Sequence, residues 1–98
     1  MNPAILIDEK EFKAFCISNH IRKAVLFGSY ATGEQADASD IDILVEFEEG
    51  WLPGLHFFSI EESLGNLLKK NVDLNTLAFL APDIRENVYK KGIILYAA

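Results

Sequence analysis

Short apolar runs alternate along this chain with segments of helical periodicity, and this alternation restricts the fold more than any other feature of the sequence. The apolar runs predict strands at residues 24–27, 40–47, 72–76 and 93–96. The helical pattern predicts one helix from Asp8, a second over residues 55–68, and a third from Pro82 to a stop at Gly92. In a chain of 98 residues, this order indicates one α/β or α+β domain over residues 1–98.

Acidic residues are concentrated in the middle of the chain. The whole sequence holds 15 Asp and Glu against 9 Lys and Arg, for a formal net charge of −6, and residues 24–68 contain nine acids but no Lys or Arg. This distribution argues against a protein that binds nucleic acid directly through a basic surface. No apolar run reaches the ~18 residues of a membrane span, and the single cysteine excludes a disulfide framework. We therefore expect a cytoplasmic protein without membrane contact.

Two aspartates separated by one residue, Asp40 and Asp42, begin the second predicted strand. Side chains two apart on a strand project from the same face. Like charges so close resist full ionisation unless a cation lies between them, and Mg²⁺ prefers such oxygen ligands. Asp73, in the third predicted strand, could join them if the two strands are neighbours. Three carboxylates could then hold two metal ions about 3.5–4 Å apart for displacement at phosphorus.

A second part of the candidate site is Gly28-Ser29, which follows the first predicted strand. Backbone N–H groups and a hydroxyl at such a turn suit an anionic phosphate, and Gly28 would let it approach closely. Each feature alone also has an ordinary explanation, as a common turn, a solvated strand face or a surface aspartate. Only the combination of the turn with the three carboxylates indicates a site.

That combination resembles the minimal nucleotidyltransferase family of the DNA polymerase beta superfamily. The resemblance rests on residues 26–33 (LFGSYATG), residues 39–45 (SDIDILV) and Val72-Asp73-Leu74. It covers nearly the whole chain, because residues 82–96 are similar to the closing helix and strand of that family. The resemblance implies a nucleotidyltransferase fold, with a mixed sheet of about four strands flanked by helices.

The resemblance also implies a reaction, in which a hydroxyl attacks the α-phosphate of ATP and pyrophosphate leaves, with two Mg²⁺ ions as cofactors. By this match, the catalytic and metal-binding residues would be Asp40, Asp42 and Asp73. The nucleotide-binding residues would be Gly28, Ser29 and Ser39. Members of the family resemble the antitoxin half of HEPN/MNT toxin–antitoxin pairs. The implied partner is therefore a HEPN toxin that receives AMP on a hydroxyl, expected to be a tyrosine.

The chain departs from the family pattern after Gly-Ser, where Tyr30 and Thr32 occupy positions that often hold basic residues. Lys23, Lys69 or Lys70, or a cation from the partner, could supply the missing charge, although a solvated surface position is the simpler interpretation of each lysine. Two alternatives stay open. The chain could be a non-catalytic antitoxin that neutralises its partner by occlusion, or a nucleotidyltransferase for a small molecule bound by another chain.

The other distinctive residues are interpreted as structural. His20 and His56 lack the spacing of metal ligands, and Cys16 falls on the apolar stripe of the first helix. The apolar stretch 51–58 is expected to lie partly in the core, with one or two exposed members able to contact a partner or a second copy. A solvated surface, or a face for a basic partner, is expected at Glu48, Glu49, Glu61 and Glu62.

Overall fold

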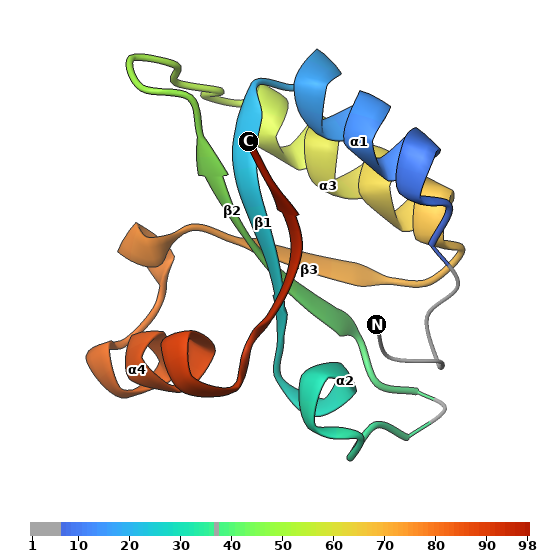
Figure 1. Cartoon of the computed structure of the whole chain (residues 1–98), viewed down its shortest axis with the longest axis vertical. Coiled ribbons are helices and arrows are strands. Elements are labelled where there is room, and N and C mark those ends of the chain that lie inside the picture. The colour runs from blue at the N-terminus through green and yellow to red at the C-terminus, as the bar shows by residue number, and fades with distance from the viewer. Residues whose placement is uncertain (1–6, 37) are drawn as a thin grey trace.

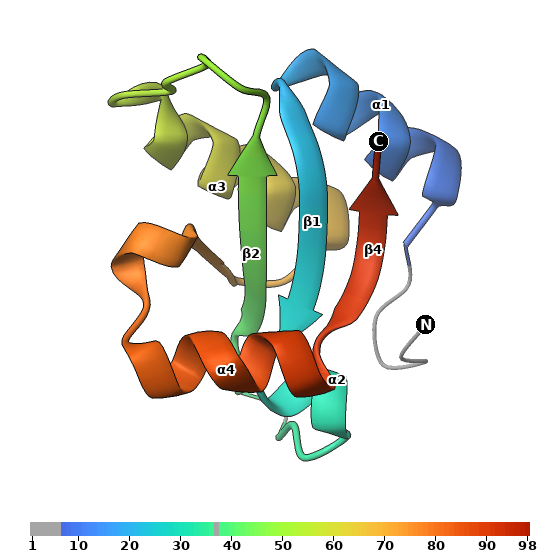
Figure 2. The same ribbon diagram turned by 60° about the vertical axis from the view of Figure 1, so that its left-hand side comes forward.

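The computed structural model describes residues 7–36 and 38–98. The elements in chain order are α1 (Glu9–Ser18), β1 (Ile21–Phe27), α2 (Ser29–Thr32), β2 (Ile41–Phe47), α3 (His56–Leu68), β3 (Val72–Asn75), the 3-10 turn η1 (Leu77–Phe79), α4 (Pro82–Lys91) and β4 (Ile93–Ala97). Helices α1 and α3 lie on one face of the sheet and α4 on the other, whereas α2 lies at the end of β1 (Figures 1 and 2).

The four strands form one mixed sheet in the order β3-β2-β1-β4. Strand β1 is antiparallel to both β2 and β4, whereas β2 and β3 are parallel. A parallel pair needs a crossover, and here the chain leaves β2, passes through α3 and returns as β3. The expected mixed sheet of four strands flanked by helices is confirmed. None of the helices in the described part of the chain is long and apolar enough to cross a membrane.

Local sequence explains where two helices begin and end. Asp8 caps α1, because its carboxylate accepts hydrogen bonds from the backbone N–H groups of Lys10 (2.9 Å) and Glu11 (3.1 Å). Pro82 stands in the first turn of α4, where its missing N–H costs no hydrogen bond. At the other end of α4, a side chain at Gly92 would collide with the backbone of the helix and with β1. Glycine therefore allows the sharp passage from α4 into β4.

Both faces of the sheet are buried, by two clusters of unequal size. The larger cluster lies between the sheet and helices α1 and α3, and it contains Cys16 and the predicted apolar stripe of the first helix. The smaller cluster lies under α4 and comprises Val25, Leu44, Leu80 and Val88. Strand β2 contributes to both, since Ile41 and Ile43 enter the larger cluster and Leu44 the smaller one. The face that carries Asp42 is thus partly covered.

Several predicted boundaries were wrong. Strand β1 begins at Ile21 rather than at residue 24. Ile21 is buried, but the charged residues that follow it obscure the strand pattern in the sequence. The short helix α2 was not among the predicted helices. Strand β2 begins at Ile41, which leaves Asp40 just outside the strand. Strand β3 ends at Asn75, and the η1 turn that follows it is too short to produce a periodic signal.

Candidate active site

Asp42 and Asp73 come together across the parallel strands β2 and β3. They are Cα partners in the register of this pair, and repulsion from Asp73 helps to raise the pKa of the Asp42 carboxyl group. The residues that follow them, Ile43 and Leu74, enter the larger core cluster. Because successive side chains of a strand point to opposite faces, both aspartates project from the other face of the sheet. The structure thus places two of the three predicted carboxylates side by side.

The carboxyl group of Asp42 has a raised pKa, about 6 instead of 3.8. Burial of the group is the largest cause, followed by repulsion from Asp73 and from Asp40, and then by the hydrogen bond to Asp73. Each of these causes favours the protonated form. Asp40 is exposed, yet it lies close enough to Asp42 to contribute to the shift. Asp73 and Asp40 thus both act electrostatically on Asp42.

This donor set fits a hard divalent cation, because it consists of carboxylate oxygens and because a cation would relieve their mutual repulsion. Across residues 7–36 and 38–98, no three acidic, histidine or cysteine side chains converge into a ready-made metal-binding cluster. The structure pairs Asp42 with Asp73 and brings Asp40 near them. Coordination of two Mg²⁺ ions by all three stays a prediction.

Gly28 ends β1 directly beside Asp42. Its backbone has φ 73° and ψ −153°, and a Cβ on this residue would overlap the carboxylate Oδ2 of Asp42. The preceding residue, Phe27, is the Cα partner of Asp42 in the antiparallel pair of β1 and β2. The turn assigned from sequence to phosphate binding therefore contacts the carboxylate assigned to metal binding.

Helix α2 is a single turn whose side chains serve the fold in several ways. Tyr30 is 2% exposed and packs in the larger core cluster. The hydroxyl of Thr32 donates to the carbonyl oxygen of Ser29 at 3.3 Å. Gly33 ends the helix in the left-handed conformation, with φ 80°. The side chain at position 30 is thus used for packing in the core.

Ser39 shapes the loop that leads into β2. Its hydroxyl oxygen accepts a hydrogen bond from the N–H of Ala36 at 2.8 Å, and its own N–H donates to the Ala36 carbonyl at 3.0 Å. The next residue is Asp40, so these two bonds hold the backbone from which that carboxylate projects. This position is compatible with a role at the site, although the observed bonds lie within the loop.

The three lysines considered from the sequence lie at different distances from the Gly28-Ser29 turn. The Nζ atom of Lys70 lies 6.0 Å from the centre of the Tyr30 ring, so this lysine stands beside α2. Lys23 lies within β1, four residues before its end, which places it about 13 Å back along the strand. Lys69 ends α3 in a left-handed conformation. The structure thus places Lys70 next to the turn.

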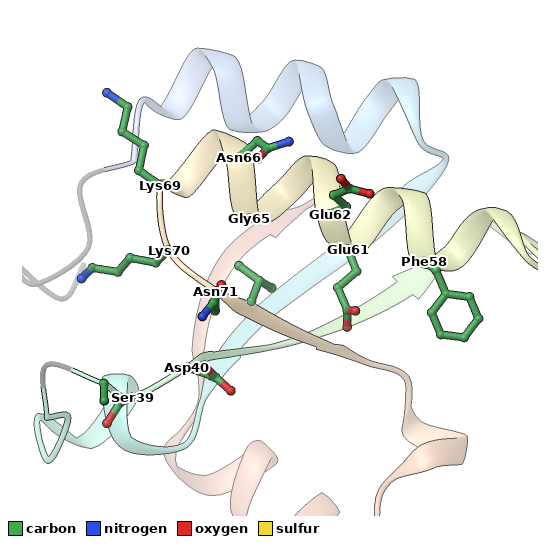
Figure 3. Close-up of a pocket in the computed structure, with 12 residues that line it drawn as sticks. Ser39, Asp40, Phe58, Glu61, Glu62, Gly65, Asn66, Lys69, Lys70 and Asn71 are labelled. Atoms are coloured by element: carbon green, nitrogen blue, oxygen red, sulfur yellow. The ribbon is translucent and has the colours of Figure 1, made fainter.

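A cavity of about 1040 Å³ opens between the start of β2 and the outer side of α3 (Figure 3). It reaches the candidate site through Ser39 and Asp40, and it extends along α3 as far as the exposed ring of Phe58. Glu61 and Lys70 also line it. Of the proposed site residues, Ser39 and Asp40 line this cavity.

A family model described as polymerase beta, nucleotidyltransferase, matches residues 10–98. The chain belongs to this family. Protein adenylyltransferase MntA of Thermococcus cleftensis is 42% identical over 74 residues, which cover 74% of this chain and 73% of that protein. MJ1215 of Methanocaldococcus jannaschii, provisionally named a protein adenylyltransferase, is 51% identical over 57 residues. That match covers 57% of this nucleotidyltransferase and 64% of its relative.

Solved structures show the same fold. A crystal structure of a toxin–antitoxin assembly with AMP-PNP matches with a TM-score of 0.75 and 26% identity, over 94% of this nucleotidyltransferase and 75% of that chain. A structure provisionally described as a minimal nucleotidyltransferase matches with a TM-score of 0.71 and 34% identity, over 87% and 86% of the two chains. The resemblance inferred from the sequence motifs is confirmed.

One residue near the site of this nucleotidyltransferase was placed wrongly by sequence reasoning. Glu61 was expected on a solvated surface, but it is half-buried and its Oε2 accepts a hydrogen bond from the N–H of Leu74 at 2.9 Å. Leu74 directly follows Asp73. No sequence signal identifies such a contact, because the partner is a backbone group on a strand that only the crossover brings near α3.

The remaining expectations for side chains agree better with the structure. His20 stacks on Trp51, with ring centres 3.9 Å apart, and its Nδ1 lies 3.1 Å from exposed Glu48. In the apolar stretch 51–58, Phe57 is buried whereas Leu52 is 89% exposed. The mixture of core and exposed residues predicted for this stretch is therefore confirmed.

Proposed function

We propose that this nucleotidyltransferase transfers AMP from ATP to a hydroxyl of a HEPN-type toxin, in the first instance a tyrosine, and acts as its antitoxin. One observation carries the proposal: Asp42 touches both Asp73 and the Gly28 turn, so that metal-binding and phosphate-binding groups adjoin. The relatives support it, since MntA is named a protein adenylyltransferase and one structural neighbour is a toxin–antitoxin assembly with AMP-PNP.

In this proposal residues 1–98 act as one catalytic domain with six site residues. The nucleotide is held by Gly28, Ser29 and Ser39, and two Mg²⁺ ions are held by Asp40, Asp42 and Asp73. When bound, Mg²⁺ would supply charge neutralisation for the phosphates and activation of the acceptor hydroxyl. The chain's own part is mainly to orient the phosphates on the turn against the carboxylates.

The transfer needs no reactant besides ATP and the acceptor hydroxyl. The acceptor oxygen forms a bond to the α-phosphorus of ATP, the bond between the α-phosphorus and the bridging oxygen breaks, and pyrophosphate leaves with that electron pair. The hydroxyl proton passes to Asp73, which is exposed and therefore able to release it to solvent. Asp42 is partly buried and therefore has less access to solvent for this exchange.

The decisive experiment follows label from ATP carrying a radioactive α-phosphate to the purified cognate HEPN toxin in the presence of Mg²⁺. The wild-type protein is expected to label the toxin, and Asp42→Asn is expected to abolish labelling. Asp83→Asn is the matched control, because Asp83 is an exposed aspartate in the first turn of α4. Failure of the wild-type protein to label the toxin, or labelling by Asp42→Asn at the wild-type rate, would falsify the proposal.

A second candidate is an antitoxin that blocks its partner by occlusion alone. The observation that favours it is Tyr30, which is packed in the core where the family often has a basic residue for the triphosphate. The two functions differ in what the Asp42→Asn variant does to the toxin. Full neutralisation of the toxin by this variant, without labelling and without calorimetric binding of ATP and Mg²⁺, would favour occlusion.

A further inference from the structure

Glu61 connects the strand that carries Asp73 to helix α3. Its Oε2 accepts the hydrogen bond from the Leu74 N–H, and Figure 3 shows the side chain reaching down from α3 toward β3. Strand β3 is the outermost strand on its side of the sheet, so only its inner edge pairs with β2. N–H groups on the outer edge of such a strand have no ladder partner. The carboxylate of Glu61 occupies the place that a further strand would fill.

The orientation of Asp73 depends on its backbone rather than on its own packing. Its side chain is exposed, whereas the Leu74 side chain, on the opposite face, is buried in the larger core cluster. Strand β3 has only four residues, so few ladder bonds hold it to β2. The hydrogen bond to Glu61 therefore contributes substantially to holding the backbone of β3 in place at Leu74, the residue next to Asp73.

We propose that Glu61 is a positioning residue for the transfer reaction: by binding the Leu74 N–H, it holds β3 in the register that sets Asp73 opposite Asp42. This inference rests on the proposed nucleotidyltransferase function. Glu61 does not contact the reacting groups itself. Its effect is transmitted through one peptide unit to the carboxylate that shares a metal site with Asp42. Groups that hydrogen-bond directly to metal ligands commonly change metal affinity about 10–100-fold when they are removed, and we expect the lower end of this range for the indirect restraint by Glu61.

A negative charge near the metal site could act without any hydrogen bond, and substitutions separate the two effects. Glu61→Gln removes the charge but keeps a side-chain oxygen that can accept from the Leu74 N–H. Glu61→Met keeps the length and helix propensity of the side chain but removes the acceptor. Glu62→Gln is the matched control, because Glu62 is the exposed neighbour on the same helix and also lines the cavity.

The first measurement needs no activity. Amide hydrogen exchange at Leu74 is followed by NMR in the metal-free protein, with thermal melting to show that each variant is folded. Exchange at Leu74 is expected to be at least about tenfold faster in Glu61→Met than in the wild type, because the amide loses its acceptor. Glu61→Gln and Glu62→Gln are expected to exchange at nearly the wild-type rate.

The second measurement is the dependence on metal. Calorimetric titration with Mg²⁺ at saturating ATP and the Mg²⁺ dependence of toxin labelling are compared for the same variants. Glu61→Met is expected to need about tenfold more Mg²⁺ for half-saturation, with the KM for the toxin unchanged. Rescue by Glu61→Gln would show that the hydrogen bond matters rather than the charge. If Glu61→Met does not fold, Glu61→Ala takes its place with the same expectations.

The inference is overturned if Leu74 exchanges faster in Glu61→Met while the Mg²⁺ dependence stays at the wild-type value, since the bond would then be only structural. It is also overturned if Glu61→Gln is as impaired as Glu61→Met. Absence of toxin labelling by the wild-type protein would instead count against the proposed function. In that case the exchange rates and the calorimetric Mg²⁺ affinity still test the link from Glu61 to Asp73.

Discussion

Gly28 and Asp42 are in such close contact that a Cβ at position 28 would occupy the same space as the Asp42 carboxylate Oδ2. The glycine also has a φ of 73°, a conformation that residues with side chains rarely adopt. Two independent requirements therefore demand glycine here. The second requirement, the contact, directly connects the proposed phosphate turn with the proposed metal site.

Replacing Gly28 by alanine is expected to reduce AMP transfer by about 100-fold or more, because the new methyl group must displace the Asp42 carboxyl group. The measurement is the rate of toxin labelling at saturating ATP. Gly50→Ala is the matched control, since Gly50 has φ 82° and a methyl group there would meet nothing within 4 Å. Both variants place a side chain at a positive φ and are therefore strained, and Gly28→Ala adds a conformation (ψ −153°) that only glycine readily adopts. Equal activity of the two variants would show that the contact does not matter.

Replacing Lys70 by glutamine is expected to raise the KM for ATP about tenfold with little change in kcat, because Lys70 stands beside α2 and can attract the triphosphate. Lys69→Gln serves as the control, as the adjacent lysine that lines the same cavity. Steady-state kinetics at fixed toxin concentration distinguish the two. A larger rise in KM for Lys69→Gln than for Lys70→Gln would contradict the assignment.

The pKa of Asp42 is raised to about 6 from an ordinary value of 3.8, and this predicts the direction in which stability changes with pH when no divalent metal is present. Between these two pH values the folded state binds this proton more tightly than the unfolded state does. The contribution of Asp42 to the free energy of unfolding therefore falls as pH rises through this window, and stays low above it.

Asp42→Asn removes this titration and is expected to be more stable than the wild type above pH 6, with the difference shrinking toward pH 4. Urea unfolding in EDTA across this range measures the difference, in which the titrations of groups remote from Asp42 cancel. A difference between the two proteins that does not change with pH would show that Asp42 titrates normally.

Cys16 is expected to be inert in the folded protein. The residue is 0% exposed, and burial raises the pKa of its thiol to about 12. Ellman's reagent at pH 8 should therefore react only after denaturant is added. Ala14→Cys, at an exposed position of the same helix, should add one thiol that reacts at once. Rapid reaction of the unmodified chain would show that α1 opens readily.

Much of the fold could be predicted because local pattern decides it. The alternation from Ile41 to Leu44 produces a strand with two different faces, and the Asp8 cap and the Pro82 start require only neighbouring residues. The start of β1 could not be predicted, because Arg22 and Lys23 hide an apolar strand whose burial depends on α1. Tertiary contacts outweigh local propensity at such positions.

The candidate site, like the fold, could be predicted from the sequence only in part. Motif spacing was enough to group Asp42 and Asp73 as candidates, but their register depends on how the crossover through α3 packs. The role of Glu61 lay beyond sequence reasoning, because its partner is the backbone N–H of Leu74 and carries no residue-specific signal. For this reason, a sequence pattern does not reveal which side chains bind backbone groups of distant segments.

The parallel pairing of β2 with β3 also has a consequence for protein synthesis. Asp40 and Asp42 leave the ribosome early, but the strand that carries Asp73 follows only after the whole of α3. Two parallel strands cannot pair until the crossover between them has been made. A chain that ends before β3 therefore contains Asp40 and Asp42 without Asp73. The proposed transfer of AMP is accordingly expected to begin only once β3 has been synthesised.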